Sequence, residues 1–237
     1  IVMLLRFRYW DDETTKRFQA AMERGVPVIA LRTSTHAFNH PKDGPWGKWT
    51  WNDAGGGWGK KVLGETWVSH WGKHKFEATR GVIEPGAEGG PLLRGVKEVF
   101  GDSDVYEAHP PSDVKVLMRG AVLAGMTPES GLSEQTKKTV KGEEQPVNKP
   151  MMPIVWTREL KNDAGKTQKI FCTTMGAATD LLNEDLRRLV VNGVFWGLGL
   201  EVPEKAEVTP VSPYEPSKYG FDGFKKGVKP EVFEWKR

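Results

Sequence analysis

The chain has 237 residues, of which 38% are hydrophobic and 27% are charged, and its formal net charge is +3. This length is sufficient for one large domain with a substantial core. The small and dispersed positive charge argues against a nucleic-acid partner. No apolar run approaches the roughly 20 residues of a membrane helix, so we expect a soluble protein that does not bind a membrane. The single cysteine, Cys172, excludes an internal disulfide and leaves a cytoplasmic, periplasmic or secreted location open.

The first 31 residues predict a strand–helix–strand unit. Residues 1–7 and 26–31 are short apolar runs typical of buried strands. The segment between them carries helix signals, because Asp11 and Asp12 can cap its start and Gly25 can end it. Such a unit favours a parallel sheet with helical crossovers.

A segment rich in Trp and Gly follows at residues 39–61, without the periodicity of a strand or a helix. Long ordered loops of this kind are usually functional. Six of the ten Trp lie between Trp46 and Trp71. Their rings can stack on the apolar faces of sugar rings or bury one another, and the sequence leaves both open. We expect a helix to begin within residues 61–67.

The middle of the chain predicts further strands at residues 79–83, 103–108 and 114–119. The next segment, residues 127–149, is polar and contains few apolar residues. It is therefore expected to be an exposed and mobile excursion.

The last part of the domain predicts a hairpin and a helix. Residues 152–157 and 169–174 are strand-like, and Asn162-Asp-Ala-Gly165 supplies the turn between them. Asn183 is a helix cap before an apolar-periodic run that ends at Gly199.

Beyond residue 200, prolines alternate with aromatic residues, which predicts an extended tail over residues 201–237. We expect this tail to wrap the body or the partner subunit of a homo-oligomer. Its aromatic residues are Tyr214, Tyr219, Phe221, Phe224, Phe233 and Trp235.

Polar side chains follow the second predicted strand, at the edge where open α/β sheets bind ligands. They are Arg32, Thr33, Ser34, Thr35 and His36. The hydroxyls could simply cap the next helix, but capping needs neither a guanidinium nor an imidazole. We therefore expect a functional site here.

A second cluster lies in residues 64–74, where His70 and His74 have the i, i+4 spacing that lets two imidazoles share one metal ion. Gly72 lies between them, and the zincin pattern is incomplete. A divalent metal held by His36, His70 and His74 is therefore an alternative to hydrogen-bonded histidines.

Three further residues to consider lie in strands predicted later in the chain. Asp104 could orient an imidazole, act as a general base or be a solvated charge at a strand end. Thr174 ends its strand, so its hydroxyl can reach the same cleft. Cys172 lies in an apolar strand and is expected to be a core residue rather than a nucleophile.

Several segments together resemble the ThuA-like (trehalose-utilisation) family. They are residues 25–38, 63–70, 153–157, 171–176 and 188–199, in this order along the chain. The resemblance covers roughly residues 1–200 and implies an α/β fold of class I glutamine-amidotransferase-like, flavodoxin-like type. That fold is a three-layer sandwich with a mostly parallel sheet.

Family members normally begin with another strand and a helix before the strand that starts here at Ile1. We therefore expect that the N-terminal part is missing and that the sheet has a gap. The resemblance does not imply amidotransferase activity, because Arg32 occupies the position of the nucleophilic cysteine and Cys172 lies on another strand. The family's Gly-His is also changed, since Gly176 is followed by Ala177.

The leading hypothesis is an enzyme of carbohydrate utilisation that hydrolyses or isomerises a sugar or sugar derivative. His36, His70 and Asp104 would be catalytic. Substrate binding is assigned to Arg32, Thr33, Ser34, Glu65, Trp67 and Thr174. Two alternatives remain open: a non-catalytic carbohydrate-binding module, and an ester hydrolase with Ser34 or Thr35 as nucleophile and His70 as base.

Overall fold

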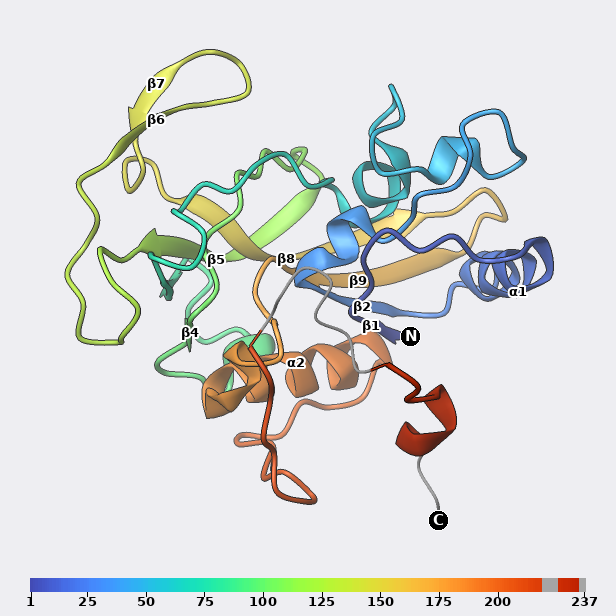
Figure 1. Cartoon of the computed structure of the whole chain (residues 1–237). Coiled ribbons are helices and arrows are strands. Elements are labelled where there is room, and N and C mark those ends of the chain that lie inside the picture. The colour runs from blue at the N-terminus through green and yellow to red at the C-terminus, as the bar shows by residue number, and fades with distance from the viewer. Residues whose placement is uncertain (219–225, 235–237) are drawn as a thin grey trace.

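A computed structural model describes residues 1–218 and 226–234, and its centre is one seven-stranded sheet (Figure 1). The strand order is β1-β2-β9-β8-β5-β3-β4. The strands are β1 (Val2–Met3), β2 (Val28–Leu31), β3 (Thr79–Ile83), β4 (Phe100–Gly101), β5 (Val114–Val122), β8 (Met152–Lys161) and β9 (Thr167–Thr173). A separate hairpin pairs β6 (Thr136–Lys138) with β7 (Glu144–Pro146).

The sheet is mixed, so the prediction of a mostly parallel sheet is wrong. Only β1–β2 and β2–β9 are parallel, while β9–β8, β8–β5, β5–β3 and β3–β4 are antiparallel. Parallel neighbours need a long crossover, whereas a tight turn returns the chain antiparallel. The predicted β8–β9 hairpin is confirmed, and the side chain of Asn162 closes its turn by accepting from the amide of Lys166 at 2.9 Å.

The gap expected in the sheet does not occur among the described residues. Every neighbouring pair from β1 to β4 is hydrogen-bonded, and β2 pairs directly with β9. Val28 lies opposite Ile170, and Leu31 lies opposite Thr173. The carboxyl ends of β2 and β9 therefore meet at the same edge.

The strand predicted at residues 103–108 is replaced by the two-residue β4, followed by extended chain. The reason is that side chains take the backbone groups that a strand would use. The amide of Ser103 donates to Asp180, the carbonyl of Ser103 accepts from Thr79, and the carbonyl of Asp104 accepts from Arg32. Regular strand pairing therefore ends at this segment, because its backbone groups form hydrogen bonds with side chains instead.

Two α-helices confirm the helix predictions. Helix α1 (Asp12–Glu23) is capped by Asp11, which accepts from the amide of Thr14 at 2.7 Å. Helix α2 (Glu184–Gly197) is capped by Asn183, which accepts from the amide of Leu186 at 2.8 Å. Both are side-chain caps of the kind that the sequence signals predict.

Each face of the sheet carries a layer, so the expected α/β architecture is present. Helix α2 packs Leu186 and Leu189 against one face, where Ile29 and Phe171 point. On the other face, Cys172 lies in a core with Phe38 and Trp58, and it is fully buried as expected. Figure 1 shows α2 below the sheet and the loop segment that follows β2 above it. Loops largely replace helices in this second layer, and the flavodoxin-like sandwich stays a prediction.

Two segments differ from what the sequence predicts. The helix expected within residues 61–67 is a single π-helical turn, Gly59–Leu63, which ends at Gly64 with a φ of +97°. The polar excursion at 127–149 contains the β6–β7 hairpin and is tied to the body. Trp71 donates to the carbonyl of Val147 at 2.9 Å.

The tail lies along the body up to Tyr214. Arg188 and Arg187 of α2 donate to the carbonyls of Ala206 and Val208, and the Tyr214 hydroxyl donates to Ala178 at 2.7 Å. A homo-oligomer through the tail stays a prediction. Tyr219, Phe221, Phe224 and Trp235 lie outside the described residues, as does the side chain of Phe233. Within the described ranges, no helix is both long and apolar enough to cross a bilayer.

Candidate functional site

The polar turn Arg32–His36 follows β2 directly, as a 3-10 turn at the carboxyl end of the strand. Arg32 has a φ of +41°, in the left-handed region that is uncommon for a residue with a side chain. Its amide donates to the carbonyl of Met175, just beyond β9, at 3.0 Å. Strained conformations of this kind persist only where the surroundings hold them, and they cluster at functional sites.

Asp104 is the centre of the site. Its side chain has no exposed surface, and three side chains donate to its carboxylate. Arg32 Nη2 and His74 Nδ1 lie 2.8 Å from Oδ1, and His70 Nδ1 lies 2.7 Å from Oδ2. Asp104 therefore orients imidazoles, which is one of the roles that the sequence left open.

The charge of Asp104 is strongly stabilised. Burial alone would raise the pKa of its carboxyl, because a buried charge loses its hydration. The hydrogen bond from His70 and the charge of Arg32 outweigh burial and lower the pKa to about 2. The carboxylate is thus a fixed anion at neutral pH.

Arg32 faces inward rather than toward solvent, and its side chain is only 5% exposed. Its Nη1 donates to the carbonyls of Asp104 at 2.6 Å and Thr174 at 2.9 Å. Its guanidinium lies 4.0 Å from the ring centre of Tyr106. These contacts make Arg32 a positioning residue that joins β2, β9 and the segment after β4.

His70 and His74 stack beside each other above Asp104. Their ring centres are 4.7 Å apart, and their side chains are 37% and 26% exposed. Because Nδ1 of His70 is held by the buried carboxylate, its Nε2 is the ring nitrogen left for proton exchange. A half-exposed histidine oriented by a buried aspartate is the arrangement of a general base.

His36 is buried in an aromatic setting. Its ring centre lies 5.0 Å from Phe7, 5.7 Å from Trp67 and 6.2 Å from Tyr106. Burial, followed by the positive charges of Arg6 and Arg32, lowers the pKa of His36 to about 3. The ring is therefore neutral at neutral pH and can offer one donor and one acceptor. Thr35 Oγ1 lies 3.2 Å from its Nδ1.

The Trp residues of the loop divide between two environments. Trp49 and Trp58 pack with Phe38 near α1 and bury one another. Trp51 and Trp67 are half-buried, and their ring centres lie 5.9 Å apart. Together they form an aromatic wall beside His36 and His70. Only this second pair is placed to contact a substrate at the histidines.

Two residues assigned to substrate binding hold the backbone in place. Ser34 donates to the carbonyl of Met3 at 3.0 Å and accepts from the amide of Leu5 at 3.2 Å. Glu65 is buried and accepts from Lys60 and from the amides of Thr66 and His109. Their side chains therefore connect loops rather than point into the site.

Thr33 and Thr174 remain as polar groups at the site. Thr33 is half-buried in the turn after β2. The Thr174 hydroxyl is buried and has no hydrogen-bond partner among the described residues, although its carbonyl accepts from Arg32. A buried hydroxyl without a partner is costly, and a bound ligand or water would satisfy it.

The possible metal ligands differ from the predicted trio. One ligand atom from each of His70, His74 and Asp104 lies within 4.8 Å of the others, the cluster that the described residues offer. His36 does not belong to it, because its ring packs against Trp67 and Tyr106. Arg32 already donates to Asp104 Oδ1, and its positive charge opposes a second cation there.

Several contributors were missed by the sequence reasoning. Tyr106 stacks on Arg32, Phe7 contacts His36, and Lys137 donates to the carbonyl of His70 at 2.5 Å. Tyr106 lies two residues after Asp104 in the chain, which is the one local signal that could have found it. Nothing local marks Phe7 or Lys137, because their proximity depends on the tertiary fold.

A hollow of about 360 Å³ lies away from these histidines. Lys115, Arg158 and Trp196 are among the residues that line it. Volume alone would point there. The convergence of titratable groups on Asp104 is the stronger sign of chemistry, because perturbed pKa values gather at functional sites.

Scans against protein-family models and against curated proteins give no match. Among solved structures, the chain is similar to a protein described as ThuA-like from Bacteroides uniformis. The TM-score is 0.47 and the identity 18%, over 82% of this chain and 67% of that one. A second protein described as ThuA-like, from Parabacteroides merdae, has a TM-score of 0.45 and 15% identity, over 89% and 72%. Both proteins are described as ThuA-like, which is the family that the sequence motifs of this chain resemble. A likeness this distant does not identify an activity.

Proposed function

We propose that this chain is an enzyme of carbohydrate utilisation that acts on a sugar or sugar derivative by acid–base chemistry. The observation that carries the proposal is the buried carboxylate of Asp104, which holds Nδ1 of His70 at 2.7 Å beside an aromatic wall. The ThuA-like sequence motifs supply the link to sugars, and the rest of the argument comes from the site itself.

His70 is the proposed proton acceptor. In its neutral form it carries its proton on Nδ1, where Asp104 accepts it, so that Nε2 can take a proton from a substrate hydroxyl or an activated C–H. The fixed anion of Asp104 then stabilises the imidazolium that forms. Returning that proton to another oxygen or carbon of the substrate completes an isomerisation. In a hydrolysis, Nε2 instead takes the proton from a water, whose oxygen bonds to the carbon as the bond from that carbon to the leaving oxygen breaks, and the leaving oxygen receives the proton.

His36 has a different proposed role. Because its pKa is far below neutral, it does not serve as an acid at neutral pH. A neutral imidazole can instead donate a hydrogen bond to a carbonyl or hydroxyl oxygen and polarise it. Both histidines contact the Trp67 ring. His70 would thus transfer the proton, and His36 would orient the substrate.

Trp51 and Trp67 support a sugar as the substrate. Half-buried indole rings present apolar faces on which a sugar ring can stack, and their N–H groups can donate to hydroxyls. The partnerless Thr174 hydroxyl adds a polar contact next to Arg32.

Glutamine amidotransferase and ester hydrolase activities are less well supported. Arg32 occupies the elbow, and burial raises the pKa of the Cys172 thiol, which suppresses the thiolate. Ser34 is hydrogen-bonded to Met3 and Leu5 rather than to a histidine. Thr35 is buried and donates to the carbonyl of Arg32 at 3.3 Å.

The test is a product search with a matched pair of variants. Purified protein is incubated with a panel of mono- and disaccharides and their oxidised derivatives, and products are detected by NMR and mass spectrometry. We expect one class to be converted and His70→Gln to lower the rate by about 10²–10⁴-fold, the usual contribution of a general base.

His109→Gln is the control, because His109 also pairs with a buried carboxylate, Glu107, at 2.8 Å and is similarly exposed. This variant should keep full activity. Equal losses in the two variants would contradict the role of His70. Binding of sugars without any conversion would favour a carbohydrate-binding module instead.

Metal content distinguishes the proposed acid–base enzyme, in which Asp104 holds His70, from a metal-dependent enzyme. Elemental analysis of the purified protein should find less than one equivalent of divalent ion. One equivalent that is lost in the His74→Gln variant would assign the His70, His74 and Asp104 cluster to an ion and overturn the hydrogen-bonded dyad.

A further inference from the structure

A second, smaller hollow of about 180 Å³ lies between the N-terminal segment and the loop after β2. Its walls include the rings of Tyr9, Trp10 and Trp46 together with the turn Pro41–Pro45. Tyr9 is 69% exposed, so its ring is accessible to a ligand. None of these side chains belongs to the site around Asp104.

His40 is the polar group of this hollow. Only 3% of the residue is exposed, and neither ring nitrogen has a hydrogen-bond partner among the described residues. The ring is held by the edge of Tyr9 at 5.6 Å and by Phe38 at 5.7 Å. Burial lowers the pKa of His40, so its ring is neutral and carries one donor and one acceptor.

The charge of the hollow is balanced. Asp12 also lines it, but its carboxylate accepts from Trp46 Nε1 at 2.8 Å and pairs with Lys16 at 2.5 Å. A cationic ligand would find no unpaired anion here, and an anionic ligand would meet the carboxylate. A neutral polyol fits, because one hydroxyl can donate and another accept while the ring lies on an aromatic face.

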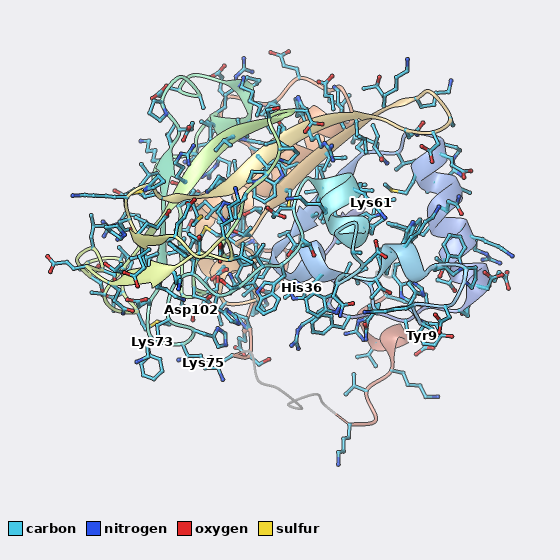
Figure 2. All side chains as sticks on the ribbon, turned by 90° about the horizontal axis from the view of Figure 1, so that it is seen from above. Tyr9, His36, Lys61, Lys73, Lys75 and Asp102 are labelled. Atoms are coloured by element: carbon cyan, nitrogen blue, oxygen red, sulfur yellow. The ribbon has the colours of Figure 1, made fainter. Side chains whose placement is uncertain are left out.

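The hollow adjoins the site around His36. The chain around Phe7 runs beside the chain around His36: the amide of Phe7 donates to His36, and the amide of Asn39 donates to Arg8. Tyr9 follows Phe7 by two residues, at most about 7 Å of chain. Figure 2 shows His36 and Tyr9 on the same side of the molecule.

We propose that the hollow walled by Tyr9, Trp46 and His40 is a second subsite, which binds a neutral sugar ring next to the site at His36. This inference extends the proposed function, because it makes the substrate at least two sugar units long. Binding in the hollow itself requires no turnover.

The test observes the hollow directly. The indole N–H resonances of Trp46 and Trp67 are assigned with Trp46→Phe and Trp67→Phe, and the protein is titrated with methyl glucoside and with trehalose. We expect the Trp46 resonance to shift and saturate with both sugars. His40→Phe keeps an aromatic ring but removes both nitrogens, and it should weaken this binding at least tenfold.

Two further variants keep the test decisive. Tyr9→Ala changes an exposed ring and should weaken binding without affecting folding. His70→Gln should leave the Trp46 titration with methyl glucoside unchanged, so a failure of the proposed chemistry remains separate from a failure of the subsite.

A Trp46 resonance that no sugar moves, or that moves equally in His40→Phe, would overturn the proposal and leave a hollow filled by water. A shift with tetramethylammonium but not with sugars would overturn it as well, because the hollow would then be an aromatic cage for cations.

Discussion

Asp104 and Asp180 are two buried carboxylates in neighbouring segments of the fold. They differ in the groups that donate hydrogen bonds to them. Asp180 accepts from the amides of Ser103, Gly176 and Ala177 and from the Ser103 hydroxyl. Asp104 accepts from a guanidinium and two imidazoles.

This difference separates a structural carboxylate from a chemical one. Backbone amides do not titrate, so Asp180 can only fix the turn after β9 against the segment after β4. The donors of Asp104 are side chains that can exchange protons or contact a ligand. Burial and the number of hydrogen bonds are similar, and the identity of the donors decides the role.

The largest expected effect comes from Asp104→Asn. An amide cannot balance the charge of buried Arg32, and an unpaired buried charge costs about 3–5 kcal/mol of stability. We expect the free energy of unfolding in denaturant to fall by this amount and turnover of any active sugar to be lost. Asp102→Asn is the control, since Asp102 is half-buried and accepts from Thr179.

Asp180→Asn sharpens the comparison. It removes acceptors from backbone amides, at about 1–3 kcal/mol for a buried group left without a partner. Near-complete activity in the fraction that remains folded is expected, measured as turnover per folded molecule. Activity that falls as far as in Asp104→Asn would erase the distinction between the two carboxylates.

The pH dependence of stability tests the buried His36. Its pKa is about 3 when folded, against an ordinary value of 6.5, so below pH 6.5 the unfolded chain binds a proton that the folded chain does not. Stability should therefore fall as the pH drops from 6.5 towards 3, by up to about 1.4 kcal/mol per pH unit. The lowered pKa of Asp104 also stabilises the folded state. This contribution is fully present above the ordinary pKa of an Asp side chain and is lost as the pH falls towards 2.

The measurement is denaturant unfolding at pH 7, 6, 5 and 4.5. His36→Phe should flatten the slope across this range. An unchanged slope in His36→Phe would show that His36 is not the group responsible.

The smallest expected effect is that of Thr174→Val. Replacing a buried hydroxyl that has no partner should leave stability unchanged or raise it by up to about 1 kcal/mol. The same variant should weaken binding of an active sugar, measured by calorimetry. A clear loss of stability would mean that the hydroxyl is satisfied by an internal partner or water.

Local signals in the sequence predicted the parts of the fold that depend on neighbouring residues. The caps Asp11 and Asn183, the turn at Asn162 and the placement of Arg32 just after β2 all follow from short-range rules. The antiparallel pairings other than the β8–β9 hairpin were missed, because strand direction depends on connections that the apolar pattern does not encode.

The site was predicted as a set of candidates rather than as an arrangement. Arg32, His70 and Asp104 were expected at strand ends and adjacent loops, but their direct contacts could not be predicted, since the partners of Asp104 lie 30 to 72 positions away in the chain. Trp67 was named as a substrate-binding residue, but the sequence did not decide whether the other Trp residues stack on a sugar or bury one another. In the structure, Trp58 is buried in the core with Phe38, whereas Trp67 lies beside His36.

The guanidinium of Arg32 also has a consequence for the order of events in folding. Its contacts close loops of 72 and 142 residues, and the contact with Thr174 cannot form until β9 has been synthesised. Long-range pairings are slow to form because their loop entropy is lost before any contact compensates for it. On the ribosome, the emerging chain would therefore hold Arg32 with an incomplete set of partners until β9 has emerged, and the site would be assembled only after that.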